Sequence, residues 1–342
     1  MSDAAGSTPG DALAAMSDLI SKGLMVQALS VAARLGIPDL VRERPKGADE
    51  LASATGAHAP TLYRLLRALT GLGVFTQDDQ ARFGLTPLGT TLCRGPQTTR
   101  ERAAFVGEPW VWNAWGNLRH SVLTGESAFR QTHGISLFEY LEHNPEARSS
   151  FHHNLSKQSE LQIPSILAAY VFSGFERLVD IGGGHGALLT AILAANPSLT
   201  GVLFDLPEVV AEAAAVASAS GVAERFEVVD GSFFDSVPPG GDCYLLKLVI
   251  HDWDDERAVQ ILRNVRAAIG DAGKLLLIEF VMPPGDAFHH AKFMDLSILI
   301  LTESGRERTE AEYRDLLAKG GFTPAAIVQT ASPLSIIESV PA

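Results

Sequence analysis

Short apolar runs alternate with longer amphipathic runs through the second half of the chain, from residue 175 onward. We expect strands at 177–181, 201–204, 226–229, 242–249, 274–280, 325–329 and 334–339, and helices at 188–195, 209–217, 255–269 and 310–319. Strands that alternate with helices in this order form a mostly parallel sheet, because the helices connect the strands and cover both faces of the sheet. The pattern predicts an α/β, Rossmann-like domain over residues 171–342.

The first half, residues 1–170, has the periodicity of helices. Near its start the apolar side chains recur at helical spacing, and they are Leu13, Met16, Leu19, Ile20, Leu24 and Met25. Further along, helices expected at 49–55 and 61–72 are followed by short strands at 74–76 and 82–85. This is the order of a winged helix-turn-helix. An N-terminal all-helical and winged-helix domain is therefore expected before the α/β domain.

A winged helix has two common uses, DNA binding and structural packing. The helix at 61–72 carries only Arg64 and Arg67 as cations, and the chain has a net charge of −13. Binding to phosphates requires an excess of Lys and Arg. We therefore expect this domain to pack two chains together, with neither nucleic acid nor an anionic membrane as a partner.

The cysteine content and the lengths of the apolar segments indicate the cellular compartment of the protein. The two cysteines, Cys93 and Cys243, lie far apart and predict neither a disulfide framework nor a zinc site. No apolar run reaches the ~20 residues of a membrane span. The opening residues MSDAAGSTPG lack the basic start and apolar core of a signal peptide. These features favour a cytoplasmic protein.

A glycine-rich turn follows the first strand of the α/β half, in LVDIGGGHGALLTAIL. Gly182, Gly184 and Ala187 match the relaxed dinucleotide pattern G-x-G-x-x-A, in which glycines let the backbone approach a ligand at a helix N-terminus. Asp205 ends the second strand, where a carboxylate can accept hydrogen bonds from ribose hydroxyls. These residues leave both NAD and S-adenosylmethionine open as the ligand.

Three features favour S-adenosylmethionine. Asp180 precedes the glycines, where it could match a cationic methionine group. The loop lies behind a large helical domain. After the third strand, Ser232, Phe233 and Phe234 offer a hydroxyl and an aromatic face to an adenine.

The fourth strand ends in LLKLVIHDWDDE, which places His251 at the carboxyl edge of a parallel sheet, where ligands usually bind. A neutral imidazole, with an ordinary pKa of ~6.5, can accept a proton from a hydroxyl group near neutral pH. A histidine that merely satisfies a strand end is the alternative. The neighbouring Asp252 and Trp253, together with the glycine loop, favour a catalytic role.

A base of this kind is usually oriented by a carboxylate. Glu279 ends the apolar strand KLLLIEF, where it would be costly to bury without a partner. Glu307, in GRERTE, is a second candidate, although it could instead cap the helix that starts near Thr309. Asp254 and Asp255 are interpreted as acids that stabilise a helix N-terminus.

The segments VDIGGGHG, LFDLPEVV, DGSFFDSVP, LKLVIHDWDDE, GKLLLIEFVMP and SGRERTEAEYRDLLAKGGF resemble, in this order, the caffeic acid O-methyltransferase family. The resemblance covers residues 178–322. It extends to the organisation of the N-terminal half, including SSFHHNLSKQSE. It implies a methyl transfer from S-adenosylmethionine to a hydroxyl of a small, aromatic acceptor, in a homodimer whose N-terminal helices interlock.

The resemblance also implies roles for single residues. His251 would be the general base, flanked by Glu279 and Glu307 and followed by Asp252. The cofactor residues expected from the motifs and the resemblance together are Gly182, Gly184, Asp205, Leu206, Ser232, Phe233, Lys247 and Ser159. The expected acceptor residues are Phe151, Leu155, Met294, Ile298 and Trp110. Trp110 forms an aromatic cluster with Trp112 and Trp115, and this cluster could be one wall of the acceptor pocket. That cluster could equally serve packing between domains.

One position departs from the family, since many members have an acid where this chain has Ser232. We expect altered contacts to the adenine rather than lost binding. Some members methylate carbon with the help of a metal. His251 and Asp252 could be two metal ligands, but Thr302 and Glu303 stand where a second histidine would be needed, and His289 and His290 are interpreted as loop residues. We expect no metal. C-methylation, an NAD-dependent oxidoreductase and a DNA-binding regulator remain as alternatives.

Overall fold

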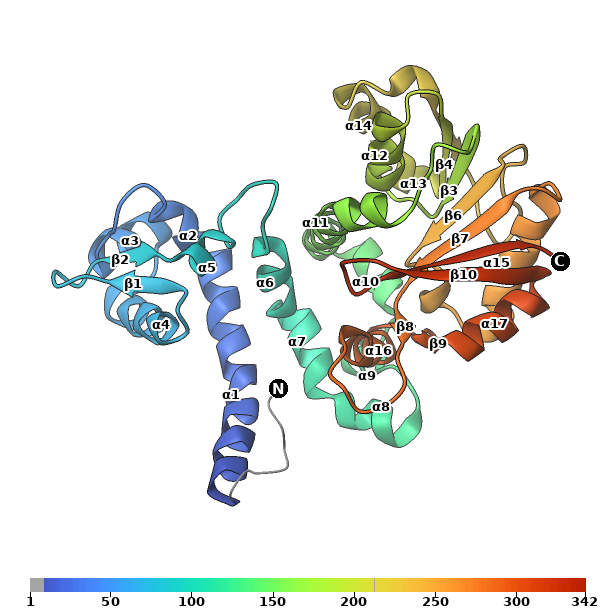
Figure 1. The fold of residues 1–342 in the computed structure, drawn as a ribbon. Helices are drawn as coiled ribbons and strands as arrows, with labels where there is room; N and C mark the ends of the chain where they lie inside the picture. Colours follow the sequence, from blue (N-terminus) through green and yellow to red (C-terminus); the bar gives the residue numbers. More distant parts are fainter. Residues whose placement is uncertain (1–8, 212) are drawn as a thin grey trace. The chain divides into compact units, whose positions relative to one another are not determined.

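The computed structural model describes residues 9–211 and 213–342, which divide into two compact units (Figure 1). The first unit runs up to Asn113 and includes Asn144–Lys157, and the second contains Ala114–His143 and Gln158–Ala342. This division differs from the single boundary expected at residue 170. It arises because two helices, α8 (Leu118–Thr124) and α9 (Ala128–His133), pack on α16 (His290–Leu301) of the second unit.

The first unit has the order expected from the sequence. Its elements are α1 (Pro9–Arg34), α2 (Ile37–Leu40), α3 (Ala48–Thr55), α4 (Ala59–Gly71), β1 (Phe75–Gln77), β2 (Phe83–Leu85), α5 (Pro87–Thr90), α6 (Arg100–Val106) and the start of α7 (Pro109–Gly116). Helix α3 ends at Gly56 in the left-handed conformation that glycine adopts without steric cost. Strands β1 and β2 pair antiparallel, and Leu51, Leu66 and Phe83 share one buried core.

Helix α1 leaves much of its apolar surface uncovered. Leu13, Ile20 and Leu24 are 71%, 73% and 77% exposed. Residues 10–34 of this helix are long and apolar enough, by length and composition alone, to cross a membrane. A soluble protein rarely exposes a contiguous apolar strip without a partner for it, so this face requires an explanation.

The second unit is built on a seven-stranded sheet of order β10-β11-β7-β6-β3-β4-β5. The parallel strands are β3 (Arg177–Ile181), β4 (Thr200–Asp205), β5 (Phe226–Asp230), β6 (Cys243–Lys247) and β7 (Lys274–Glu279), and the antiparallel ones are β10 (Phe322–Gln329) and β11 (Ser335–Pro341). Strand β6 is apolar on both faces because helices cover both sides of the sheet. The mostly parallel, Rossmann-like sheet expected from the sequence is confirmed.

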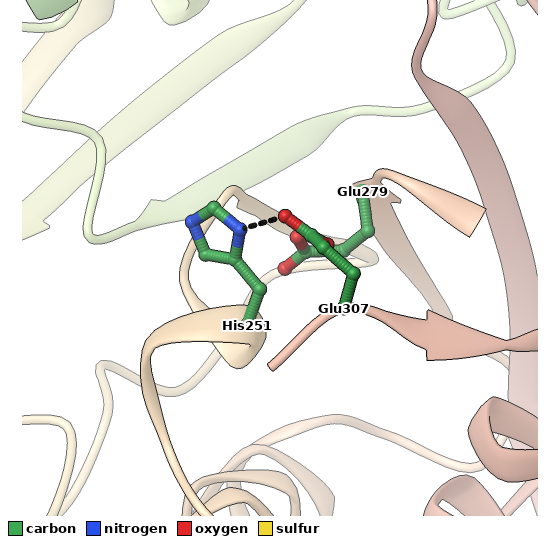
Figure 2. A group of neighbouring side chains, drawn as sticks. All are labelled: His251, Glu279 and Glu307. Carbon is green, nitrogen blue, oxygen red and sulfur yellow. Dashed lines mark hydrogen bonds and ion pairs between the residues drawn. The ribbon is translucent and has the colours of Figure 1, made fainter. Parts of the chain in front are cut away.

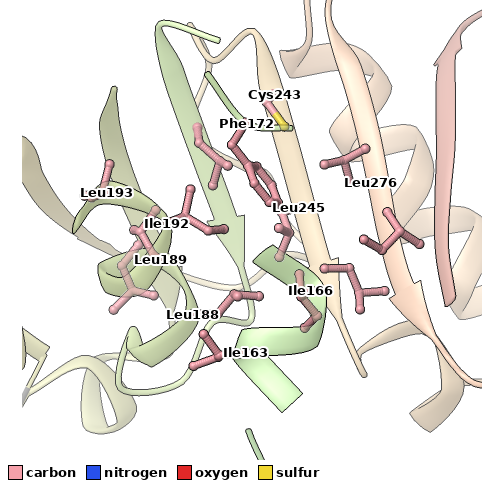
Figure 3. Packing of buried hydrophobic residues seen from close by; sticks show 14 of the residues in the cluster. Ile163, Ile166, Phe172, Leu188, Leu189, Ile192, Leu193, Cys243, Leu245 and Leu276 are labelled. Atoms are coloured by element: carbon pink, nitrogen blue, oxygen red, sulfur yellow. The ribbon is translucent and has the colours of Figure 1, made fainter. Parts of the chain in front are cut away.

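Two buried clusters lie on the two faces of this sheet. One gathers side chains from α11 (Pro145–Ala169), α12 (Ala187–Ala195) and α14 (Ala213–Ala219), where Ile166, Leu189 and Leu245 pack together (Figure 3). The other cluster gathers side chains from α15 (Asp255–Ala268) and α17 (Glu310–Lys319). Apolar packing therefore covers both faces of the sheet, and polar side chains lie at its carboxyl edge.

Two expectations about helices need correction. The run 209–217 is divided into α13 (Pro207–Val210) and α14, and residue 212 between them lies outside the described residues. Helix α16 lies where the sequence suggested a loop around two histidines. His289 caps this helix by accepting a hydrogen bond from the Ala291 N–H, and His290 is its first residue. The sequence did not predict this helix because its nearly continuous apolar run hides the helical period.

Shorter elements complete the second unit. They are α10 (Leu137–His143), the 3₁₀ helices η1 (Ala223–Arg225) and η2 (Ile250–Asp252), and the strand pair β8 (Val281–Met282) with β9 (Arg308–Thr309). Strand β8 follows directly after β7, so the pairing of β8 with β9 brings the segment around residue 307 next to the end of β7.

Candidate active site

Charged side chains end three of the parallel strands at the carboxyl edge of the sheet, and β3 lies between two of them, β4 and β6. Asp205 is the last residue of β4, Lys247 of β6 and Glu279 of β7. Parallel strands end at the same edge, which is where ligands bind in sheets of this kind. The sequence therefore brings these groups to one edge through the lengths of the strands alone.

His251 lies just beyond the end of β6, in the 3₁₀ turn η2. The chain enters this turn through Leu248, whose φ of 54° is unusual for a residue with a branched side chain. His251 is only 7% exposed, and its Nδ1 lies 2.8 Å from Glu307 Oε1. Figure 2 shows the ring facing this carboxylate, with the dashed line marking their hydrogen bond. A carboxylate accepts only, so Nδ1 carries the proton of this hydrogen bond, and in the neutral ring Nε2 keeps a lone pair. The nearest acid to Nε2 is Asp252, whose Oδ1 is 3.7 Å away.

Glu279 is fully buried beside this pair and contacts the backbone of the turn. Its Oε1 accepts hydrogen bonds from the N–H groups of Val249, at 3.1 Å, and Ile250, at 2.9 Å. The two glutamates expected to flank His251 are thus both present, but they have different contacts. Glu307 binds the imidazole ring, whereas Glu279 holds the turn that carries it.

The carboxylates around His251 favour its protonated form. Burial by itself would lower the pKa of His251, but the negative charges of Asp252, Glu307 and Glu279 raise it to about 10. Burial raises the pKa of Glu279 to about 7, so this group takes up a proton near neutral pH. A protonated Glu279 carries no charge, which reduces the negative potential at the imidazole and makes the ring easier to deprotonate.

The glycine loop between β3 and α12 holds a second constellation. Gly182, Gly184 and Gly186 all have positive φ, which glycine tolerates far better than other residues. The Gly184 N–H donates to Asp205 Oδ2 at 2.9 Å, and the Leu206 N–H donates to Asp205 Oδ1 at 2.7 Å. Each carboxylate oxygen still has a lone pair for a further donor. Asp205 is therefore held in place with acceptors that fit the two hydroxyls of a ribose.

A buried acid, Asp180, and a half-buried cation, Lys247, lie behind this loop. Asp180 is 1% exposed, and its Oδ2 has no hydrogen-bond partner among the described residues. Burial raises the pKa of Asp180 to about 7, although Lys247 opposes this rise, and burial lowers the pKa of Lys247 to about 8. A Cβ added at Gly183 would lie 2.6 Å from Asp180 Oδ2, so only glycine lets the loop cover the acid so closely. A buried acid with one oxygen free of hydrogen bonds among the described residues, beside a glycine cradle, fits a cationic cofactor such as S-adenosylmethionine.

The expected aromatic face follows β5. Phe233 and Phe234 both pack on Trp253, with ring centroids 6.2 Å and 4.7 Å from it. The Ser232 hydroxyl accepts a hydrogen bond from the Phe234 N–H at 3.2 Å, which leaves its own proton available to a ligand acceptor. Ser159, the remaining expected cofactor residue, is half-buried on the part of α11 that belongs to the second unit.

The expected acceptor residues fall into both units. Met294 and Ile298 lie on α16 four residues apart, so they share one face of this helix in the second unit. Trp110, Phe151 and Leu155 belong to the first unit. There Phe105 contacts both Trp110 and Phe151, and Trp110 is 6% exposed. The role of these three residues in binding an acceptor stays a prediction.

Sequence reasoning missed the residues on either side of Glu307. Arg308 is fully buried and binds Asp255, which was expected only to stabilise a helix N-terminus. Arg306 binds the same acid. The signal was available, because a Glu between two arginines in one short segment implies partners for all three charges. By contrast Asp254 does cap α15, as expected.

The alternative role of Glu307 as a helix cap does not hold. Thr309 caps α17 in a reciprocal capping box with Glu312, which leaves Glu307 to His251. His251, Glu279 and Glu307 each offer a ligand atom within 4.8 Å of the others, a spacing that would also suit a metal ion. Their observed hydrogen bonds, from ring to carboxylate and from backbone to carboxylate, give both acids a function without one.

Comparison with known proteins agrees with this geometry. The model of the O-methyltransferase domain matches residues 115–323, and that of the O-methyltransferase dimerisation domain matches residues 17–95. A phenazine O-methyltransferase of Lysobacter antibioticus is 43% identical over 318 residues, which cover 93% of each chain. A mitomycin biosynthesis 6-O-methyltransferase of Streptomyces lavendulae is 39% identical, over 94% of this chain and 93% of the relative.

Solved structures show the same likeness. The structure of a mitomycin 7-O-methyltransferase superposes with a TM-score of 0.90 at 38% identity, covering 97% of this chain and 98% of that one. An O-methyltransferase from neocarzinostatin biosynthesis, solved with S-adenosylmethionine and a naphthoic acid, has a TM-score of 0.79 at 36% identity and covers 93% and 96% of the two chains. The family resemblance is confirmed, and it decides the cofactor in favour of S-adenosylmethionine over NAD. The chain belongs to the O-methyltransferase family and is an S-adenosylmethionine-dependent O-methyltransferase.

Proposed function

We propose that His251 is the general base of this O-methyltransferase and that its acceptor is a hydroxyl group on a small aromatic molecule. The observation that carries the proposal is the 2.8 Å hydrogen bond between His251 Nδ1 and Glu307. It fixes the tautomer in which Nε2 can accept a proton. Asp252, 3.7 Å from Nε2, would stabilise the imidazolium that forms.

S-adenosylmethionine, when bound, supplies the electrophilic methyl group. The residues of the chain place and deprotonate the acceptor. His251 Nε2 takes the hydroxyl proton, which turns the hydroxyl oxygen into a stronger nucleophile, and Glu307 stabilises the positive charge on the ring. Glu279 keeps the turn in place through the N–H groups of Val249 and Ile250. Placement of the two reactants lowers the activation free energy by several kcal/mol, about 7 kcal/mol in well-oriented systems.

The proposed cofactor contacts follow the geometry of the carboxyl edge. Asp205 would accept hydrogen bonds from the ribose, and the glycine backbone would lie along the methionine portion. Ser232 and Phe233 would contact the adenine. The proposed set is Gly182, Gly184, Asp205, Leu206, Ser232, Phe233, Lys247 and Ser159.

The proposal of an aromatic acceptor draws on the relatives. Their names refer to a phenazine, to 3-amino-4-hydroxybenzoate and to 2,7-dihydroxy-5-methyl-1-naphthoate. All are flat aromatic molecules, and Met294 and Ile298 on α16 offer apolar side chains suited to such a ring. Methyl transfer in the biosynthesis of an aromatic natural product is the role that we propose.

Transfer to nitrogen is a second candidate. A relative from Streptomyces davaonensis that is 38% identical is named as an 8-amino-8-demethylriboflavin N,N-dimethyltransferase. A paired panel of phenols and anilines with the same ring systems separates the two outcomes, since mass spectrometry detects the added methyl on either. Phenol methylation supports the first proposal, and methylation of the anilines alone supports the second.

We propose that the reaction proceeds without a metal, which also separates O-methylation from metal-assisted C-methylation. Oε1 of Glu307 is already bound to the His251 ring and Oε1 of Glu279 to the turn, while Oε2 of each has no hydrogen-bond partner among the described residues. Dialysis against a chelator should leave the rate unchanged. A rate that falls and is restored by one divalent cation would contradict this.

We further propose that the protein is a homodimer and that it works in the cytoplasm. The match to a dimerisation domain over residues 17–95 includes most of α1, whose exposed apolar strip a second chain would cover. This explains the strip without a membrane. The two cysteines, Cys93 and Cys243, are free and buried, which is compatible with a reducing compartment.

The role of His251 is tested by His251→Ala. We expect turnover to fall about 10²-fold or more, because the base is lost. The affinity for S-adenosylhomocysteine, measured by calorimetry, should not change, because His251 belongs to a different constellation from the glycine loop. An equal loss of turnover and of cofactor affinity would mean that the residue is structural.

A further inference from the structure

Residues 306–308, which we name the 306–308 arm, form hydrogen bonds with the turn that carries His251. The N–H of Arg306 donates to the carbonyl oxygen of His251 at 2.8 Å. The next residue, Glu307, accepts the hydrogen bond from the imidazole ring. Ring and backbone of the same histidine are therefore held by two consecutive residues of one segment.

Arg308 binds the backbone on both sides of the histidine. Its Nη1 donates to the Ile250 carbonyl oxygen at 3.0 Å, and its Nη2 donates to the Trp253 carbonyl oxygen at 2.8 Å. These two carbonyls bracket His251 and Asp252 in the sequence. A single planar guanidinium thus fixes the separation between the start and the end of the catalytic turn.

The charge of Arg308 is buried and balanced. The side chain is 0% exposed, and its Nε and Nη2 also bind Asp255 Oδ1 at 3.0 Å and 2.8 Å. A buried cation is costly unless it is paired and hydrogen-bonded. Lysine carries the same charge but lacks the rigid fork that contacts three groups in one plane. The site is therefore specific for arginine.

Two further contacts keep the arm against the turn. Gly305 precedes it, and a Cβ added there would lie 2.6 Å from the His251 carbonyl oxygen, so glycine permits this close approach. Asp295 of α16 accepts a hydrogen bond from the Glu307 N–H at 2.9 Å. The arm is braced from behind by the helix that carries Met294 and Ile298.

We propose that Arg308 is a positioning residue for methyl transfer, which sets the orientation of His251 through the carbonyl oxygens of Ile250 and Trp253. This rests on the proposed role of His251 as the base. Arg308 contacts the backbone of the turn and Asp255, and its effect on the reaction is transmitted by the turn. Loss of the fork lets the turn shift, which moves Nε2 from the acceptor hydroxyl and loosens the bond to Glu307.

The test is Arg308→Lys in the full-length protein. We expect turnover to fall about 10²-fold, because a displacement of the order of 1 Å is enough for such a loss. Affinity for S-adenosylhomocysteine should not change. The pKa of the His251 ring, followed by NMR in the free protein, should fall towards that of an ordinary histidine, because the charge of Glu307 is held less closely.

The charged and titratable groups around His251 are all retained in this variant. They are Asp252 on the same turn, Glu279 on β7 and Glu307 on the arm, with Asp295 of α16 and Tyr313 of α17 beyond them. A change in the histidine titration therefore reports geometry. Arg314→Lys is the matched control, because Arg314 pairs with Glu310 at the surface and should leave turnover and titration unchanged.

A lower melting temperature with unaltered turnover and histidine titration would show that Arg308 only supports the fold, and would overturn the proposal. If Arg308→Lys does not fold, Asp255→Asn replaces it, because Asp255 is half-exposed and its carboxylate holds the guanidinium in the position from which it binds the two carbonyl oxygens. A smaller fall in turnover is then expected, and no fall overturns the proposal. His251→Ala, assayed alongside, shows separately whether the proposed base is correct.

Discussion

At the scale of single residues, the site depends on which carboxylate touches which part of His251. Glu307 contacts the ring and Glu279 contacts the backbone, although both are buried glutamates within a few ångströms of each other. The contacts predict different consequences for mutation. Removing the charge of Glu307 acts on proton transfer, whereas removing Glu279 leaves two buried N–H groups without an acceptor.

The pH dependence of turnover tests the contact between Glu307 and His251. In the wild type the rate should rise with pH through the pKa of His251, because only the neutral ring accepts a proton, and that pKa is raised by the surrounding carboxylates. Glu307→Gln keeps a hydrogen-bond acceptor but removes a negative charge. The pKa of His251 should then fall, and the rising limb of the profile should move to lower pH.

The maximal rate of Glu307→Gln should also be lower, because the imidazolium loses its counter-charge. The control is Glu310→Gln, which removes an exposed carboxylate from α17 without contact to the histidine. If the rising limb stays where it is in the Glu307→Gln profile, the titrating group is not His251, and the assignment of the base is wrong.

At the scale of elements, the glycine loop after β3 is coupled to the turn after β6. A Cβ at Gly182 would lie 2.7 Å from Val249 Cγ2, and the Val249 N–H is bound to Glu279. The tight packing at Gly182 therefore links the proposed cofactor loop to the turn that carries His251.

Gly182→Ala tests the loop. Its φ of +68° strains any side chain, which costs about 1–3 kcal/mol, and the added methyl collides with Val249. We expect the affinity for S-adenosylhomocysteine to fall at least about tenfold in calorimetry, since ~1.4 kcal/mol corresponds to that factor. Gly184→Ala separates strain from collision, because Gly184 also has a positive φ but nothing lies within 4 Å of its added Cβ. Equal losses in the two variants would argue against the collision.

At the scale of the whole molecule, the acidic net charge and the exposed strip of α1 define what the protein can associate with. A net charge of −13 disfavours phosphate-rich partners. The strip of Leu13, Ile20 and Leu24 offers apolar area that a second copy of the chain can bury. The match to a dimerisation domain starts within this helix, at residue 17.

Leu24→Glu tests this association. A glutamate at a position that is 77% exposed costs little in the isolated chain but would place a charge in an apolar interface. We expect sedimentation velocity to show a shift from dimer to monomer. Lys22→Glu, two residues away and thus on another side of the helix, should remain dimeric. A wild-type protein that sediments as a monomer would contradict the homodimer itself.

The sequence alone determined the α/β architecture and the identity of the chemical groups at the site. Local periodicity and strand lengths place Asp205 and Glu279 at the ends of parallel strands, and such ends meet at one edge. The strand expected at 242–249 ends at Lys247 in the structure, and Lys247 was expected at the cofactor site only from the family resemblance. Helix α17 and strand β3 were predicted at their observed bounds for the same local reason. The nucleotide-type loop followed from the spacing of its glycines.

Only the tertiary structure decided how those groups are used. Whether Glu307 caps a helix or binds His251, and whether Asp255 stabilises a helix N-terminus or balances Arg308, depends on contacts between segments about 50 residues apart. No local pattern encodes such distances. The division of the chain into units was likewise set by packing of α8 and α9 on α16. Residue types indicated which chemical groups the site contains. Their orientation could be learned only from the folded chain, because a buried charge is stable only when it is paired, and the pairs join segments that are distant in the sequence.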